Sequence, residues 1–127
     1  MQRINFQSIP VGDPSRALAF YCDHLGMTVQ TDAPYEDGWR WIFLQIPGAD
    51  TLLHFVKAGD ITMGHTLPVL SLVSDNVDAD TRRLSDAGAT IIDGPSDAPW
   101  HQAVRYTLFK DSETNTVLLQ SSSAQGA

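Results

Sequence analysis

The clearest hydrophobic pattern lies in residues 40–56, where two apolar runs flank a turn that contains Pro47 and Gly48. Runs of β-branched and aromatic residues around such a turn predict an antiparallel hairpin. Side chains two residues apart share one face of a strand. One predicted face is wholly apolar and suits a helix packed against it; it carries Ile42, Leu44, Ile46, Leu53 and Phe55. The other face carries Trp41, Phe43, Gln45, Leu52, His54 and Val56.

The second face of this hairpin is the first candidate for a binding surface. A turn centred on Gly48 and Ala49 places Phe43 directly across from His54 and Trp41 across from Val56. Aromatic rings grouped around one imidazole favour a ligand surface over a plain core. Two ordinary buried faces are the alternative.

The remaining pattern predicts two helices and several short strands. Asp13, followed by a proline, predicts a helix start, and apolar residues recur at helical spacing through residues 15–25 until Gly26. Asp75 is expected to cap a second helix that ends at Gly88. Outside the hairpin, strands are expected at 4–11, 27–31, 69–73, 90–92, 104–109 and 116–120, and loops at 32–38, 57–66 and 93–99.

The predicted elements repeat. Segments 13–26 and 75–88 have the same length, and each follows a strand and precedes a short strand, a loop and a hairpin. The same βαβββ order twice predicts an α+β fold with a mixed sheet. We therefore expect one domain over 1–127, with one module at about 1–58, a second at about 67–121 and a frayed tail at 122–127.

Composition excludes several classes of function. The 127 residues are 43% hydrophobic, which favours a folded domain, and the net charge of −7 disfavours nucleic acid as a partner. No apolar run approaches the ~20 residues that span a bilayer, so no membrane partner is expected. The N-terminus lacks a signal pattern, which predicts a cytoplasmic protein. The single cysteine, Cys22, is expected to be a buried structural thiol rather than a nucleophile.

Short motifs in both halves carry a family resemblance. In the first half they are Val11-Gly12-Asp13-Pro14, Ala19-Phe20-Tyr21 and Leu25-Gly26-Met27. In the second they are Asp75-Asn76-Val77-Asp78-Ala79, Leu84, Ala87-Gly88, Pro99-Trp100, Phe109-Lys110-Asp111 and Asn115. In this order they resemble the vicinal oxygen chelate superfamily, the glyoxalase/bleomycin resistance/dioxygenase group. The resemblance implies two tandem βαβββ modules that curl into a cup around a cavity, with helices outside, and a homodimer.

The same resemblance bears on metal binding. Metal-dependent members place one ligand on each of four strands, and these positions fall here on Phe6, His54, Val69 (Pro68 after a register slip) and Leu118. Only His54 is a donor, whereas a catalytic divalent ion needs about three N or O ligands from the protein. Gln7 points away from Phe6 unless a bulge rotates the strand, and His65 lies in the linker. No metal or other cofactor is therefore expected; a divalent metal is the alternative.

Eight residues are candidates for contact with a ligand. They are His54, Trp41, Phe43, Phe6, Gln45, Trp100, His101 and Tyr106. His54 either hydrogen-bonds a ligand, acts as a general base near neutral pH, or is a satisfied core histidine. Trp100 either lines the mouth of a cavity or anchors its loop. Arg105 and Tyr106 point to opposite faces of their strand, and the sequence leaves open which one faces a cavity.

Three functions remain open at this point. The first is metal-free binding of a small aromatic or cationic molecule, as in bleomycin resistance. The second is a metal-dependent lyase, isomerase or dioxygenase. The third is a metal-free enzyme that uses His54 as acid or base. The absent ligands favour the first over the second.

Overall fold

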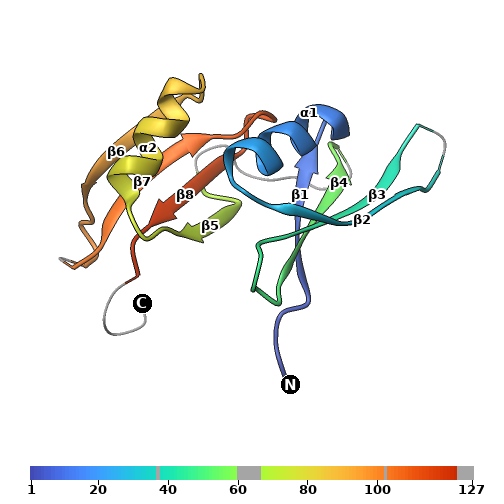
Figure 1. The fold of residues 1–127 in the computed structure, drawn as a ribbon, viewed down its shortest axis with the longest axis horizontal. Coiled ribbons are helices and arrows are strands. Elements are labelled where there is room, and N and C mark those ends of the chain that lie inside the picture. The colour runs from blue at the N-terminus through green and yellow to red at the C-terminus, as the bar shows by residue number, and fades with distance from the viewer. Residues whose placement is uncertain (37, 60–66, 102, 123–127) are drawn as a thin grey trace. The chain divides into compact units, whose positions relative to one another are not determined.

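The computed structural model describes residues 1–36, 38–59, 67–101 and 103–122 (Figure 1). The chain divides into two compact units, Met1–Met63 and Gly64–Ala127. Each unit is a module with its own sheet and its own helix, and the two are described one at a time below.

The first module contains four strands and one helix. In chain order these are β1 (Phe6–Val11), α1 (Pro14–Ala19) continued by a π-helical turn (Phe20–His24), β2 (Thr28–Pro34), β3 (Arg40–Gln45) and β4 (Leu52–Lys57). The strands lie in the order β1-β4-β3-β2, with β1 parallel to β4 and the other pairs antiparallel.

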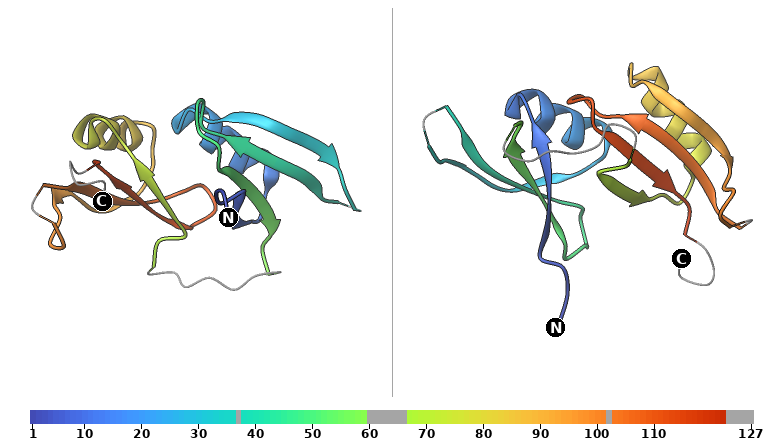
Figure 2. Two further views of the ribbon diagram at one scale, coloured as in Figure 1. Left: turned by 90° about the horizontal axis from the view of Figure 1, so that it is seen from below. Right: turned by 180° about the vertical axis from the view of Figure 1, so that it is seen from behind.

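The second module repeats this plan. It contains β5 (Leu70–Val73), α2 (Val77–Asp86), β6 (Ile91–Asp97), β7 (Arg105–Lys110) and β8 (Thr116–Gln120). Its strand order is β5-β8-β7-β6, and β5 is parallel to β8. Figure 2 shows the same succession of elements in both modules from two further sides. The predicted α+β class with two βαβββ modules and mixed sheets is confirmed.

One predicted helix cap is right and the other is displaced by one residue. The Asp13 carboxylate accepts a hydrogen bond from the backbone N–H of Arg16 at 3.2 Å, as expected of an N-cap. The second cap is Asn76 and not Asp75, because the Asn76 side chain accepts from the Ala79 N–H at 3.0 Å. The helix must start there to turn Val77, Thr81 and Leu84, which are all buried, toward the sheet.

The first helix is not one α-helix through residue 25. It ends as an α-helix at Ala19, and a wider π-helical turn covers Phe20–His24. Within this turn Tyr21 is fully buried, and its ring centroid lies 5.8 Å from that of Phe55. An apolar spacing of three and four residues does not distinguish an α turn from a π turn, so the sequence pattern missed the change.

Two strands run through segments that were expected to be loops. β2 continues to Pro34, and β6 contains Gly94 and Pro95. Both strands are at the edge of their sheets, and both have register shifts along the pairing. An edge strand with bulges tolerates a proline, because no neighbour needs its missing N–H. In the first module, β1 begins at Phe6, two residues later than predicted.

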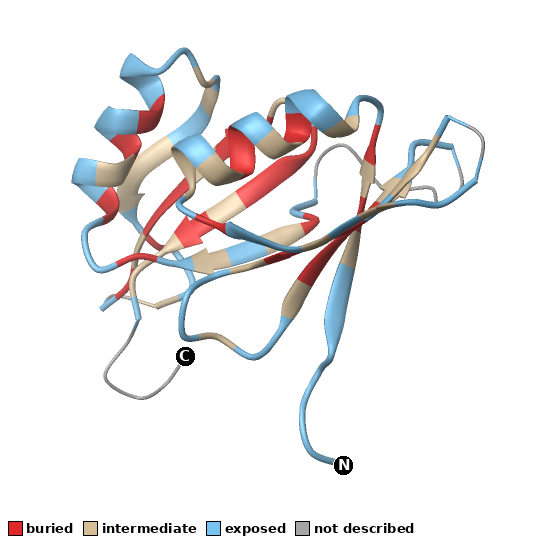
Figure 3. Cartoon of the chain, turned by 45° about the vertical axis from the view of Figure 1, so that its right-hand side comes forward, coloured by how far each residue is buried: buried red, intermediate tan, exposed pale blue. Residues whose placement is uncertain are grey.

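The two predicted faces of the first hairpin are confirmed within the strands. Ile42, Leu44, Leu53 and Phe55 are buried. Figure 3 shows how buried and exposed residues are distributed over the strands and helices. Ile46 was wrongly included: β3 ends one residue earlier, and the side chain is 42% exposed. Phe43 is paired with His54 across β3 and β4, as predicted.

Cys22 is half-buried rather than fully buried, because it lies on the π-helical turn beside the buried Tyr21. Burial raises the pKa of its thiol, and the charge of the neighbouring Asp23 raises it further. A raised pKa keeps the sulfur protonated, so the expectation that Cys22 is no nucleophile gains support.

Candidate functional site

The backbone of the first module places His54 between two partners. On β4, His54 is paired with Ser8 of β1 on one side and with Phe43 of β3 on the other. These side chains share one face of the sheet because residues paired across neighbouring strands point to the same side. It is the face opposite Phe55, which contacts the ring of Tyr21.

Three aromatic rings surround the imidazole of His54. Phe43 stacks on it, with ring centroids 4.5 Å apart and planes at 16°. The Trp41 centroid lies 4.6 Å away, and the Phe6 ring meets the imidazole edge-on at 5.3 Å. We call Phe6, Trp41, Phe43 and His54 the His54 cluster.

The His54 cluster combines a buried polar group with rings that reach solvent. His54 is only 6% exposed, while Phe6 is 40% and Trp41 is 38% exposed. Large aromatic side chains this exposed are unusual on a sheet face unless something packs on them. The cluster therefore offers a planar molecule an apolar stacking surface with one polar group beneath it.

The two nitrogens of His54 differ in their hydrogen bonding. Nδ1 lies 3.4 Å from Oγ of Ser8. Nε2 is buried and has no hydrogen-bond partner among the described residues. A buried polar atom without a partner costs about 1–3 kcal/mol, and such an atom in a native protein calls for a functional explanation.

The same burial lowers the pKa of His54. The imidazole is therefore neutral at pH 7. In this state it is suited to hydrogen-bonding a neutral ligand or to acting as a base.

This lowered pKa predicts a pH dependence of stability. A group whose pKa is lower in the folded state binds more protons when unfolded, so the free energy of unfolding should decrease as the pH falls below about 6.5. His54→Phe removes the titration, so its stability should decrease less than that of the wild type between pH 7 and pH 5. Urea unfolding at a series of pH values measures both slopes. Equal slopes would show that His54 titrates in the folded protein as it does in the unfolded chain.

The other predicted residue of this sheet face, Gln45, has a different task. Its side-chain amide donates to the backbone oxygen of Ala49 at 2.9 Å and so holds the hairpin turn. Gln45 therefore stabilises the turn and does not belong to the His54 cluster.

Three predicted residues belong to the second module. The rings of Trp100 and Tyr106 lie 5.1 Å apart, and the Tyr106 hydroxyl donates to the carboxylate of Asp93, which raises the pKa of Tyr106. Trp100 is 53% exposed, so it is not a buried anchor of its loop. His101 accepts a hydrogen bond through Nδ1 from the N–H of Ala103 at 3.1 Å, which ties it to its own loop.

The register of β7 settles the question of Arg105 and Tyr106. Arg105 forms ion pairs with Asp78 of α2, at 2.9 Å, and with Asp97 of β6. Tyr106 lies on the opposite face, where Leu108 and Leu118 pack against it and its buried neighbours. Tyr106 therefore lies on the face that corresponds to the His54 cluster in the first module.

The residues at the family's metal positions do not fit a metal ion. Leu118 occupies the place in the second module that His54 has in the first, because it is paired with Ser71 and Leu108 as His54 is with Ser8 and Phe43. Phe6 and Val69 also offer no donor atom. The pairing of β1 with β4 has no register shift, so Gln7 stays on the other face.

Among the described residues, no three histidine, cysteine, aspartate or glutamate side chains lie together so that they could hold a metal ion. His65 lies outside the described residues. The side chains at the family's metal positions are thus unsuited to a catalytic metal.

Sequence reasoning missed two members of the site. Ser8 contacts His54, and alternation along β1 from Phe6 would have found it. Tyr35 lies beyond the end of β2, with its ring 5.0 Å from that of Trp41, and no local signal indicated this contact. It depends on the extension of β2 past its expected end.

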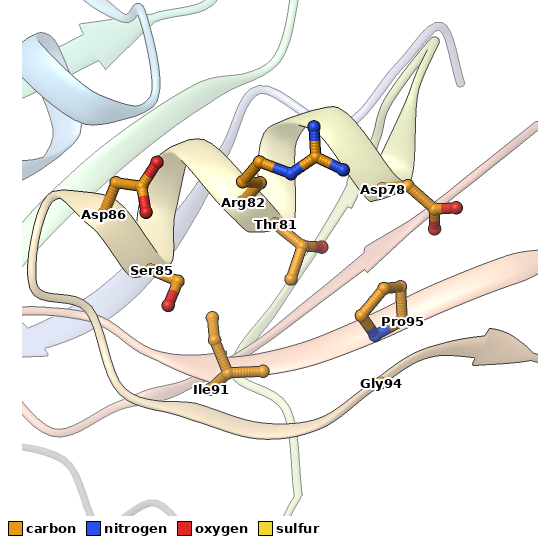
Figure 4. A pocket seen from close by; sticks show the side chains of 8 residues that line it. All are labelled: Asp78, Thr81, Arg82, Ser85, Asp86, Ile91, Gly94 and Pro95. Carbon is orange, nitrogen blue, oxygen red and sulfur yellow. The ribbon is translucent and has the colours of Figure 1, made fainter.

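A separate open hollow of about 450 Å³ lies between α2 and β6 of the second module (Figure 4). Its lining includes Thr81, Arg82, Ile91 and Pro95. None of the predicted site residues lines it, so it is not the candidate site.

Comparison with known proteins identifies the family. The model of the Glyoxalase/Bleomycin resistance protein/Dioxygenase superfamily matches residues 3–119. The chain belongs to this superfamily. The fold and the two-module repeat are therefore those of the superfamily, and the departures at Phe6, Val69 and Leu118 are features of this member.

Several solved structures are similar to this superfamily member. TnmS3, an antibiotic binding protein from Streptomyces sp. CB03234, is 32% identical with a TM-score of 0.80, over 95% of this chain and 96% of that one. A glyoxalase/bleomycin resistance protein from the same organism is 34% identical with a TM-score of 0.73, over 92% and 98%. A superfamily member from Sphaerobacter thermophilus DSM 20745 is 26% identical with a TM-score of 0.79, over 95% and 98%.

The comparison with curated proteins gives no match. Among the described residues, no helix is both long enough and apolar enough to cross a membrane.

Proposed function

We propose that this superfamily member is a metal-free binding protein that sequesters a small aromatic or cationic molecule. The observation that carries the proposal is the His54 cluster, in which partly exposed rings surround a buried imidazole nitrogen that has no hydrogen-bond partner among the described residues. A planar ligand would stack on Trp41 and Phe43 and hydrogen-bond His54. The similarity to a protein described as antibiotic-binding supports an antibiotic as the ligand.

The donor set favours binding without a metal. Three of the four family positions carry Phe6, Val69 and Leu118, which have no N or O donor in their side chains. An aromatic ring stands at the first position instead, and the Phe6 ring lies 5.2 Å from that of Phe43. The first family position therefore carries an aromatic ring where metal-dependent members have a ligand.

The test is a titration of the protein with planar aromatic antibiotics, in which the tryptophan fluorescence of the protein reports binding. We expect saturable binding that is the same with and without EDTA, no stoichiometric Zn, Ni, Mn or Fe in the purified protein, and an unchanged ligand by mass spectrometry. Binding that EDTA abolishes and a divalent ion restores would establish the metal-dependent alternative.

One observation favours a second candidate, a metal-free enzyme with His54 as acid or base. Burial lowers the pKa of His54, and a neutral imidazole is a competent base at pH 7. Recovery of a converted ligand from the same titration would favour this candidate over sequestration.

We further propose that the protein is a cytoplasmic homodimer. Exposed apolar side chains on sheet faces and edges, such as Val29 and Val73, favour self-association. Sedimentation at micromolar concentration should give twice the mass of the 127-residue chain, and a monomer would refute the dimer.

A further inference from the structure

We infer that His54 presents the lone pair of Nε2 to the ligand, so that the site selects aromatic molecules with a hydroxyl or N–H group at the ring edge. This inference rests on the proposed function, which requires only that an aromatic molecule stacks on the His54 cluster. It adds the direction of the hydrogen bond: the ligand donates and the protein accepts.

The direction follows from the two tautomers of a neutral imidazole. In the first, Nδ1–H donates to Oγ of Ser8, 3.4 Å away, and Nε2 carries a bare lone pair. In the second, the Ser8 hydroxyl donates to Nδ1, and Nε2 carries a hydrogen for which the described part of the chain offers no acceptor. In each tautomer, Nε2 is left without a partner among the described residues: its lone pair is unused in the first and its hydrogen in the second.

The surroundings of the two groups favour the first tautomer. A buried N–H without an acceptor is rarer in folded proteins than a buried acceptor without a donor. Nε2 is buried, so the second tautomer would strand its hydrogen. Ser8 is only half-buried, so in the first tautomer its hydroxyl hydrogen can still reach water. The free protein therefore holds an unused acceptor under the aromatic rings.

Phe6 is the ring best placed to move aside for such a ligand. It is the first residue of β1, an edge strand, and residues 1–5 before it lie in no helix or strand. Its ring meets the imidazole edge-on, whereas Phe43 stacks flat against it from a strand inside the sheet. Rotation of Phe6 would leave the stack on Phe43 intact, so we expect the ligand to approach the imidazole from this side.

Three probes of one shape test the inference: naphthalene, 2-naphthol and isoquinoline, at a pH above the pKa of isoquinoline. Naphthalene has no polar group, 2-naphthol carries a hydrogen-bond donor, and isoquinoline carries a hydrogen-bond acceptor. We expect 2-naphthol to bind the wild type about tenfold more tightly than naphthalene, the ratio that one hydrogen bond to a buried group provides. In His54→Phe, which keeps an aromatic ring, the two should bind equally.

The outcomes separate this inference from the proposed function. Tighter binding of isoquinoline than of 2-naphthol would show that Nε2 donates, and equal binding of all three would show that it does not reach the ligand. Either result overturns the inference and leaves aromatic binding standing. Failure of all three to bind would overturn both.

A second measurement needs no ligand. Long-range ¹H–¹⁵N correlation spectra of the wild type distinguish a protonated from an unprotonated imidazole nitrogen. We expect the hydrogen of His54 on Nδ1. A hydrogen on Nε2 would refute the inference whatever the probes show, and Ser8→Ala, which removes the Nδ1 partner, should shift the tautomer population toward Nε2–H.

Discussion

Replacing Trp41 by alanine is expected to weaken binding of a planar ligand by about 1–3 kcal/mol, or roughly 5- to 150-fold in Kd. The indole is 38% exposed and lies 4.6 Å from the imidazole, so it contributes stacking area at the point where the ligand meets His54. Isothermal titration calorimetry with a ligand found in the fluorescence screen measures the change.

The matched control for Trp41→Ala is Ile92→Ala, which also removes a large exposed apolar side chain from a strand, in the second module. It should leave Kd unchanged.

His54→Ala should weaken binding less than Trp41→Ala and reduce selectivity. If His54→Ala instead abolishes turnover of a ligand while affinity stays the same, the protein is an enzyme. Indifference of binding to Trp41, Phe43 and His54 would mean that this face is only core.

Replacing Gly94 by alanine is expected to destabilise the protein by about 3 kcal/mol or more, in the range of severe single substitutions. A Cβ at this position would lie 2.5 Å from the backbone oxygen of Tyr106 and 3.0 Å from Cα of Thr107. These are main-chain atoms of the paired strand β7, so they cannot move aside as a flexible side chain would. The backbone φ of +98° adds strain for any residue with a Cβ.

Gly88→Ala separates the clash from the backbone strain. Gly88 has a nearly equal φ of +96°, but a Cβ there meets nothing within 4 Å. It should therefore cost only the left-handed backbone strain, about 1–2 kcal/mol. Urea unfolding of both variants measures the difference. Equal losses would show that β6 and β7 move apart without cost and that the close approach at Gly94 is unimportant.

Local pattern was sufficient for most of the fold. Alternation in residues 40–56 predicted the faces of β3 and β4 and the pairing of Phe43 with His54, because a strand has a fixed period of two. The Asp13 cap was equally local, since its partner is the backbone three residues later. The repeated spacing of 13–26 and 75–88 predicted both modules for the same reason.

Other features depended on partners far along the chain. The π-helical turn at Phe20–His24 accompanies the burial of Tyr21 against Phe55, a contact between residues distant in sequence. Pro34 and Pro95 lie in strands because β2 and β6 happen to be edges, and edge position is a property of the whole sheet. No local rule states which strand will lack a neighbour.

The candidate site also has features that the sequence determined and features that depended on the fold. The sequence by itself determined the residue types, which include the aromatic rings, the imidazole of His54 and the carbon side chains at Phe6, Val69 and Leu118. Only the tertiary structure decided that Ser8 contacts Nδ1, that Nε2 finds no partner in the part of the chain the structure describes, and that Gln45 is used by its own turn. The physical reason is that burial and hydrogen bonding depend on which strands pair, and in the first module this pairing joins Ser8 to a histidine 46 residues away.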